Sequence, residues 1–244
     1  METFFSTSEK IKHIIKNFNL TKTLYVSSII IGDAHTGKKS LVRSLFPDAP
    51  LVSGRNQKEV ELALKSYDEL IITDFEKLVN QNILDFTNKR IIATANYIGN
   101  ANIIDNTFAF IYMMPSLEER PEDVQYLKEI YINEASKTLM LKTDTLSMEN
   151  ITLSLEKNTK SLKESIYTHI MKQSMQASDI EDILFNYLLN HLDGNDAYKK
   201  HLSLYERPLI EAGLQKFGSQ LQLSSVLGIN RNTLRKKIHE HHID

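Results

Sequence analysis

One short segment limits the fold of this chain more than any other: a loop with two glycines and a lysine, between an apolar and an amphipathic run. The apolar run 25–31 is typical of a buried strand, and 39–46 has helical spacing. In such a unit, glycines turn backbone N–H groups toward an anion and the helix N-terminus adds positive potential. Residues 32–38 are thus predicted to form a phosphate-binding loop, with Lys38 reaching the outer phosphates. A glycine-rich turn without a ligand is the alternative.

Short β-branched runs alternate with amphipathic stretches from about residue 22 to residue 115. This alternation predicts a parallel sheet with crossover helices, the α/β class. From 116 to 175 the strand signals stop and the apolar spacing becomes helical, which predicts a lid-like helical part of the same domain. The expected strands are 25–31, 51–53, 70–73, 90–94 and 109–113.

The composition becomes small and polar at 173–178, where Ser178 and Glu181 have the spacing of a capping box. We therefore expect one domain over residues 1–175 and a second over 176–244. The helix that follows this cap has an apolar stripe and is expected to end at 193–195. The stripe consists of Ile180, Ile183, Leu184, Tyr187, Leu188 and His191.

Three short helices are expected in the C-terminal part of the chain. Pro208 is placed near the start of the first, where its missing N–H costs little, and Gly218 ends it. The second covers 220–227 and closes at Gly228, which can adopt a left-handed backbone. Asn230 then caps the third helix.

The third helix has one apolar and one basic face. Residues 229–239 contain four basic residues and no acidic one. Such a helix suits the major groove, where basic side chains contact phosphates and an arginine in the first turn can reach guanine. By charge alone, a solvated surface helix explains the pattern equally well. The inward residues are Ile229, Leu234 and Ile238, and the outward ones are Arg231, Asn232, Arg235, Lys236 and His239.

The segment 228–238, GINRNTLRKKI, resembles the recognition segment of the Fis family of DNA-binding domains, which NtrC-type enhancer-binding proteins share. The likeness covers about residues 180–244. It implies double-stranded DNA as a partner and a homodimer formed through about residues 179–217. Gly218-Ser219, Leu221 and Leu223 depart from the family pattern, which is expected to weaken phosphate contacts from the second helix. The implied DNA-contact residues are Ser219, Gln220, Asn230, Arg231, Asn232, Thr233, Arg235, Lys236 and Lys237.

The front part of the chain resembles the AAA+ domain of the same NtrC-type family. After the phosphate loop, 70–74 looks like the Walker B strand, 91–96 like the sensor strand and 117–124 like the entry to the lid. The resemblance implies a three-layer α/β P-loop domain followed by an all-α helix-turn-helix domain, with ATP or ADP as ligand. The implied nucleotide-binding residues are Gly32, Thr36, Gly37, Lys38, Lys39, Ser40, Asp74 and Asn96.

Several features that support ATP hydrolysis are absent from this sequence. Lys39 follows the loop lysine and Ser40 comes one place late for magnesium, although the family's loop also lacks a hydroxyl residue there, so Mg²⁺ is left open. Phe75 stands where the family has its catalytic glutamate. Glu76, one residue further along a strand end, is expected to point elsewhere. We therefore assign no catalytic residue and expect negligible hydrolysis.

The leading hypothesis is a sequence-specific transcription regulator whose front domain is nucleotide-responsive or purely structural. That domain would dock RNA polymerase or a regulatory protein. Activation of sigma-54 polymerase is not expected, because 100–112 contain no arginine or lysine to act as a finger and the Gly-Ala-Phe-Thr-Gly-Ala loop is missing. An active ATPase that remodels a transcription complex and a Fis-like DNA-bending protein remain alternatives.

Composition adds few limits. The net charge is −2, there are no cysteines, and no apolar run approaches the ~20 residues of a membrane span. We expect a soluble, cytoplasmic protein with no membrane partner. The histidines at 239, 241 and 242 could bind a metal, but a frayed polar terminus is the preferred interpretation, so no metal site is assigned.

Overall fold

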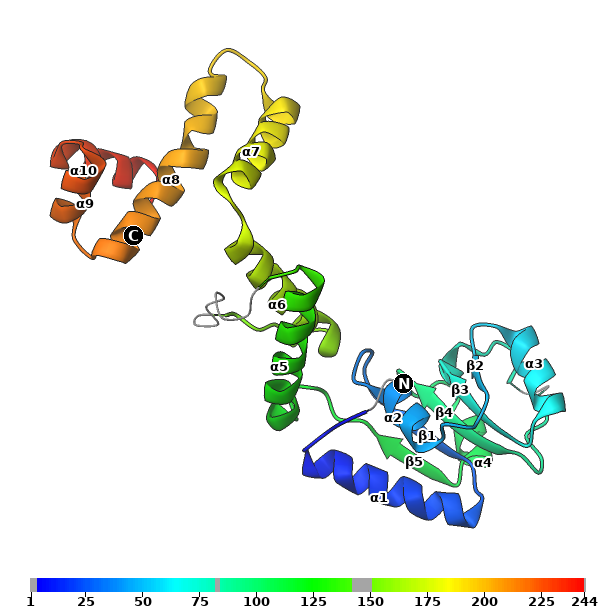
Figure 1. The fold of residues 1–244 in the computed structure, drawn as a ribbon. Coiled ribbons are helices and arrows are strands. Elements are labelled where there is room, and N and C mark those ends of the chain that lie inside the picture. The colour runs from blue at the N-terminus through cyan, green and yellow to red at the C-terminus, as the bar shows by residue number, and fades with distance from the viewer. Residues whose placement is uncertain (1–3, 82–83, 142–150, 244) are drawn as a thin grey trace. The chain divides into compact units, whose positions relative to one another are not determined.

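The computed structural model describes residues 4–81, 84–141 and 151–243, and it divides into two compact units, Met1–Met175 and Gln176–Asp244. Figure 1 shows a sheet with surrounding helices in the first unit and helices alone in the second. The last helix of the first unit, α6, ends at Ser174, and α7 begins at Ala177, so two residues connect them. No helix in the described part of the chain combines the length and the apolarity that a membrane span requires.

The first unit contains a five-stranded sheet with the order β2-β3-β4-β1-β5, and every neighbouring pair is parallel. In register, Ser28 of β1 lies opposite Ile92 of β4 and Phe110 of β5. The parallel sheet predicted from the sequence is confirmed. Its first strand is shorter than expected, because the preceding helix continues to Leu24 and Tyr25 then turns with a φ of 50°. The strands are β1 (Ser28–Ile31), β2 (Leu51–Ser53), β3 (Glu69–Thr73), β4 (Arg90–Ala95) and β5 (Phe110–Met113).

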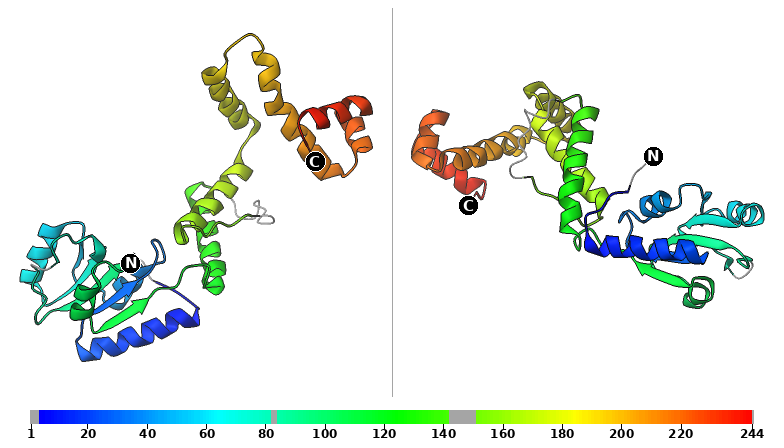
Figure 2. Two further views of the ribbon diagram at one scale, coloured as in Figure 1. Left: turned by 180° about the vertical axis from the view of Figure 1, so that it is seen from behind. Right: turned by 60° about the horizontal axis from the view of Figure 1, so that its bottom comes forward.

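Helices cover both faces of this sheet, which gives the three layers expected (Figures 1 and 2). On one face, α1 (Glu9–Leu24) and α2 (Lys38–Leu45) pack against alternate strand residues such as Ile30. On the other, α3 (Gln57–Ser66) and α4 (Ala101–Thr107) pack against residues such as Ile29. Both sides of each central strand are therefore apolar, as parallel sheets require.

Two helices follow the sheet within the first unit. α5 (Pro121–Thr138) starts with a proline in its first turn, where the missing N–H does no harm. α6 (Thr159–Ser174) lies beside α5 in all ribbon views. The two helices share a small apolar core made by Leu117, Ala135, Leu162, Ile166 and Ile170. We refer to α5 and α6 together as the lid.

The second unit consists of α7 (Ala177–His191), α8 (Ala197–Phe217), α9 (Gln220–Leu227) and α10 (Arg231–Glu240). Two expectations about it are wrong. The capping box of α7 joins Gln176 and Asp179, not Ser178 and Glu181, because the helix starts at Ala177 and already includes Ser178. Pro208 lies inside α8, because no breaker separates it from the helix start. The carbonyl of Leu204 loses a helical partner there, but this residue is 41% exposed, so water can replace it.

The last three helices form a small domain around buried Ile210, Leu223 and Leu234. α8 and α9 end at Gly218 and Gly228, whose φ angles of 63° and 65° are left-handed. Asn230 caps α10 by accepting a hydrogen bond of 2.8 Å from the backbone N–H of Asn232. The predicted bounds of α9, both glycine ends and the Asn230 cap are confirmed.

Candidate functional site

The glycine loop predicted to bind phosphate connects β1 to α2. Gly37, with a φ of 95°, is the N-cap of α2, a conformation that favours glycine. Gly32 must also be glycine, because a Cβ atom there would lie 2.5 Å from the carbonyl oxygen of Met114. Lys38 is buried, and its Nζ donates to the carbonyl oxygens of Gly32 at 2.6 Å and Asp33 at 2.5 Å. Burial lowers the pKa of Lys38 to about 8, so the lysine is mainly protonated at pH 7.

A buried ion pair secures one side of the loop. The guanidinium of Arg120 donates to the carbonyl oxygen of Thr36 at 2.9 Å and pairs with Asp123 at 3.2 Å. Asp123 in turn accepts hydrogen bonds from the Ser6 hydroxyl at 2.6 Å and from the Thr7 N–H at 2.9 Å. Arg120 and Asp123 therefore join the N-terminal segment, the loop and the lid, a role that the sequence did not reveal.

The start of α6 holds the other side of the loop. The amide of Asn158 donates to the carbonyl oxygen of Ala34 at 3.0 Å, and the hydroxyl of Thr159 donates to that of His35 at 2.7 Å. His35 and Asn158 have left-handed φ angles of 61° and 53°. The residues at the starts of both lid helices thus bond three consecutive carbonyl groups of the loop, those of residues 34–36.

The residues after β3 take an unexpected path. Asp74 has a left-handed φ of 52° and is followed by the short helix η1 (Phe75–Lys77). This turn buries Phe75 in the core and brings Glu76 back to the sheet edge. There the Oε1 atom of Glu76 accepts a hydrogen bond of 2.9 Å from Asn96, whose Oδ1 accepts one of 3.2 Å from Lys38. The expectation that Glu76 points elsewhere is wrong, because the two-residue period of the strand does not continue past Asp74.

Arg55 lies beside Asp74, although nothing in the sequence singled it out. Its Nε atom is 2.7 Å from an Asp74 carboxylate oxygen. The preceding Gly54 passes so close that a Cβ atom there would lie 2.4 Å from the Asp74 carbonyl oxygen. The parallel pairing of β2 with β3 creates this contact, which local sequence signals do not report.

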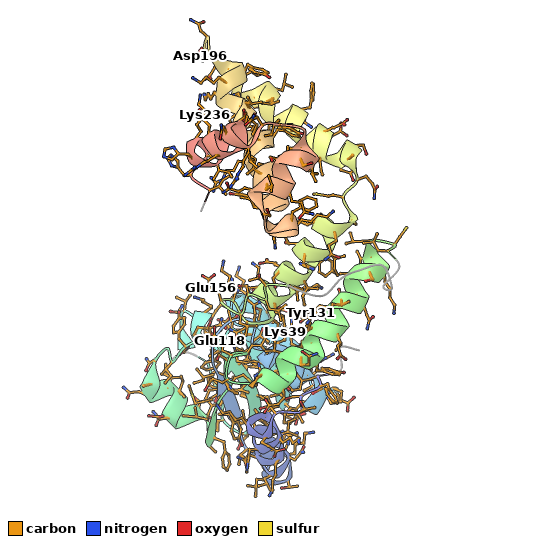
Figure 3. The ribbon with its side chains drawn as sticks, turned by 90° about the vertical axis from the view of Figure 1, so that its left-hand side faces the viewer. Lys39, Glu118, Tyr131, Glu156, Asp196 and Lys236 are labelled. Atoms are coloured by element: carbon orange, nitrogen blue, oxygen red, sulfur yellow. The ribbon has the colours of Figure 1, made fainter. Side chains whose placement is uncertain are left out.

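A groove runs along these residues. One part, about 520 Å³, is lined by the loop residues 34–40 and by Arg55, Asp74, Asn96 and Thr159, among others. A second part, about 310 Å³, shares Thr36, Gly37, Ser40 and Thr159 with the first and adds the aromatic residues Phe4, Phe5, Tyr126 and Tyr131. Lys39 and Tyr131, both labelled in Figure 3, belong to the first and the second part, respectively. A polar, cationic part joined to an aromatic part suits a phosphate chain attached to a flat base. All the nucleotide-binding residues expected from the sequence line this groove except Gly32, which lies at the start of the loop.

The exposed face of α10 carries most of the predicted DNA contacts. Lys236 projects from the outer surface of the helix (Figure 3), with its Nζ 3.7 Å from Glu240 on the next turn. Asn230 belongs to the helix end, because its side-chain oxygen is used in the cap. The exposed row, which we call the α10 basic row, consists of Arg231, Asn232, Thr233, Arg235 and Lys236.

Lys237 does not share this exposed row. Its ammonium pairs with Glu206 of α8, and Glu206 also accepts a hydrogen bond of 3.1 Å from His241. The pKa of Glu206 is lowered mainly by its hydrogen bond with Lys237, and also by that with His241. This cluster attaches α10 to α8. No group of three or more potential metal ligands occurs among the described residues, including these histidines.

The helix α9, the second of the three C-terminal helices, offers fewer predicted DNA contacts than α10. Ser219 is the N-cap of α9 and accepts from the N–H of Gln222 at 3.5 Å, and Gln220 is the first helical residue. Leu223 is buried against Gly213, so it belongs to the core. Leu221 is 64% exposed and is the surface departure from the family pattern.

α7 has no buried residue in this single chain. A stripe of this kind would ordinarily be buried in a folded protein, and within this chain it is not. The exposed large apolar residues of α7 are Ile180, Ile183, Leu184, Phe185, Tyr187 and Leu189.

Comparisons with known proteins place the C-terminal unit in a family. The model described as "Bacterial regulatory protein, Fis family" matches residues 202–241. A putative Fis-like DNA-binding protein of Pseudomonas aeruginosa is 34% identical over 83 residues, which cover 32% of this chain and 79% of that protein. The DNA-binding transcriptional regulator NtrC of Azospirillum brasilense is 43% identical over 65 residues, which cover 25% of this chain but only 14% of that relative.

The whole chain is similar in fold to a larger protein. NtrX from Brucella abortus, crystallised with ADP, aligns with a TM-score of 0.58 at 14% identity, covering 100% of this chain and 70% of that one. The ATP complex of the same protein gives a TM-score of 0.57 at 13% identity, over 98% and 69% of the two chains. The chain therefore belongs to the Fis family of DNA-binding proteins through its C-terminal unit, and its fold as a whole is similar to that of NtrX.

Proposed function

We propose that this protein is a sequence-specific transcription regulator that binds duplex DNA through α10. The α10 basic row carries the proposal, because it is exposed, lies within the family match and has an arginine in the first turn. Arginine at this position can read the edge of a guanine, while Lys236 reaches the backbone. Lys237 is left out of the contact set, since Glu206 already pairs with it.

The proposed active form is a homodimer that buries the α7 stripe against its copy. A dimer of this kind would supply two recognition helices to one DNA site, as family relatives with a helix-turn-helix do. Residues of about 179–217 would form the interface. This arrangement explains why α7 exposes so much apolar surface in one chain.

The front unit is proposed to bind ATP or ADP in the groove over the phosphate loop. The loop geometry, the buried lysine and the aromatic part of the groove support this ligand. NtrX of Brucella abortus, which has a similar fold, was crystallised with both nucleotides. Since Asn158 and Thr159 connect the loop to the lid, bound nucleotide would act on the segment that precedes α7. Polymerase or a regulatory protein is the proposed partner of this unit.

A gel-shift series with the full-length protein tests the DNA proposal. Duplexes selected from a random pool should bind at least about a thousandfold more tightly than random duplexes at physiological salt. Equal affinity for selected and random duplexes would favour the Fis-like architectural role. An absence of binding to any duplex would reject both. A sigma-54 promoter assay complements the series, and no ATP-dependent opening is expected.

ATP hydrolysis through Glu76 is the second candidate function. The observation in its favour is the hydrogen bond between Glu76 and Asn96 at the edge of the groove. Steady-state phosphate release separates the two candidates. Turnover on the order of 1 s⁻¹, abolished in Glu76→Gln, would establish an ATPase. Turnover indistinguishable from that of Lys38→Ala would leave the groove with a binding role alone.

A further inference from the structure

We propose that Arg55 replaces magnesium in this groove: nucleotide binds without a divalent cation, and the guanidinium leaves Asp74 to contact the terminal phosphate. This inference rests on the nucleotide binding proposed above. It defines which form of the ligand, free or metal-bound, the protein recognises, and it assigns a ligand contact to a residue outside the phosphate loop and its usual partner strands.

The residues present do not fit a magnesium ion. P-loop proteins hold the metal with the hydroxyl residue after the loop lysine and with the aspartate at the end of the Walker B strand. Here Lys39 occupies the first position, and Ser40 lies about 100° further around the helix. The Asp74 carboxylate is already bonded to Arg55 at 2.7 Å. Mg²⁺ needs an octahedron of oxygen atoms, and two cationic side chains beside the site oppose its approach.

The charges that line the phosphate part of the groove favour an uncomplexed polyanion. Three cationic side chains, Lys38, Lys39 and Arg55, line it together with a single carboxylate, that of Asp74. Glu76 is not among the lining residues, and Asn96 holds one of its oxygen atoms. A triphosphate without metal carries the negative charge that this set lacks.

Arg55 can exchange Asp74 for a phosphate at little expense. Its side chain is 65% exposed, and exposed ion pairs contribute little net stability. The planar guanidinium donates two parallel hydrogen bonds to phosphate oxygens, a geometry that lysine does not reproduce. Arg55 lines the same part of the groove as the loop, so the exchange needs a side-chain rotation and no backbone movement.

Calorimetric titration of the full-length protein with ATP, ADP and AMP, in EDTA and in excess MgCl₂, tests the inference. The Kd for ATP measured in EDTA should be equal to the Kd measured in magnesium, or up to about threefold lower. Arg55→Gln should weaken ATP binding about tenfold in EDTA but change AMP binding little, because AMP lacks the terminal phosphate. The matched control is Lys58→Gln, which removes one exposed positive charge on α3 outside the groove. Circular dichroism should show both variants folded.

Each other outcome has a distinct meaning. If ATP binds only with magnesium, or if Arg55→Gln behaves as Lys58→Gln does, the inference is overturned while nucleotide binding stands. If ATP and ADP bind under neither condition, nucleotide binding itself is rejected and the inference with it. The DNA-binding proposal is unaffected in both cases, because the gel-shift series tests it separately.

Discussion

Asn96 donates a hydrogen bond of 2.9 Å to the carboxylate of Glu76. The same asparagine accepts a hydrogen bond from Lys38, so a continuous polar chain links the phosphate loop to the residue that follows β3 by three positions. Among the nearby charges, that of Glu76 contributes most to stabilising the protonated form of Lys38. The protonation of the loop lysine therefore depends on Glu76, a residue that strand alternation alone would have predicted to point away from the loop.

Nucleotide affinity should decrease as the pH rises above about 8, because burial lowers the pKa of Lys38 to about 8. Phosphate binds the protonated lysine, so affinity is constant below this pKa and falls up to about tenfold per pH unit above it, until the higher pKa of the complex is reached. Fluorescent ATP titrated from pH 6.5 to 9.5 measures the effect. Lys38→Ala should lose most of the affinity at every pH. A flat wild-type profile over this range would contradict the prediction.

Two substitutions on α10 should affect DNA binding in different ways. Arg231→Ala should weaken binding to a selected site by ~1–3 kcal/mol and reduce sequence preference, because it removes a base contact. Lys236→Ala should weaken binding to all duplexes about equally and lower the salt slope by about one phosphate contact. Lys65→Ala, which removes an exposed lysine from α3 in the first unit, serves as the control. Unchanged affinity in both α10 variants would show that α10 does not enter the groove.

Placing a charge in the α7 stripe should convert the proposed dimer into a monomer. Ile180 is 57% exposed in the single chain, so Ile180→Glu disturbs no core contact within it. In a dimer the same carboxylate would be buried without a partner, which is strongly unfavourable. Analytical ultracentrifugation measures the mass, and Asn186→Glu, outside the stripe, is the control. A dimer that persists in Ile180→Glu would exclude this stripe as the interface.

Gly213→Ala should destabilise the C-terminal unit by about 1–3 kcal/mol. A Cβ atom at this position would lie 2.3 Å from a methyl carbon of Leu223, so either this buried side chain must take another rotamer or α8 and α9 must separate. The double variant Gly213→Ala, Leu223→Ala removes the clash and should cost less than the sum of the two single changes. Urea unfolding of the four proteins gives the coupling. Additive effects would indicate that the two residues do not compete for space.

Glu206 should make the stability of this unit depend on pH in the acid range. Its pKa is lowered in the folded state, chiefly by the hydrogen bond with Lys237. A carboxylate whose folded pKa is depressed stabilises the fold above its unfolded pKa, about 4.3, and this contribution disappears as the pH falls through the folded value. Thermal unfolding between pH 7 and pH 3 should therefore decline less steeply in Glu206→Gln than in the wild type. Glu211→Gln is the control on the same helix.

Sequence signals identified the parts of the fold that depend on local chemistry. Gly218, Gly228 and Asn230 end or begin helices through their own backbone preferences, so α9 and α10 were predicted at their observed positions. Buried parallel strands are visible as apolar runs because helices cover both faces of the sheet. Pro208 misled, because no breaker separates it from the start of α8, and a helix can continue through a proline where water can bond the freed carbonyl.

The polar contacts of the groove could not be predicted in this way. Arg55 and Asp74 are 19 positions apart, and Arg120 and Thr36 are 84 apart, so their meeting depends on strand order and lid position. Glu76 reaches Asn96 only because Asp74 adopts a left-handed backbone, a conformation uncommon outside glycine and asparagine-like residues. The sequence pattern locates the loop and Lys38, but it does not reveal the charged and polar residues that contact them.

Met175 and Gln176 alone connect α6 to α7. A chain extends by at most ~3.6 Å per residue, so this tether is short. In the proposed dimer of C-terminal units, each front unit would be confined near its twin at an effective concentration on the order of millimolar. An affinity between front units that is too weak to detect when they are isolated would then be enough to hold them together. Pairing of the helices would thus decide whether the two nucleotide grooves act separately or together.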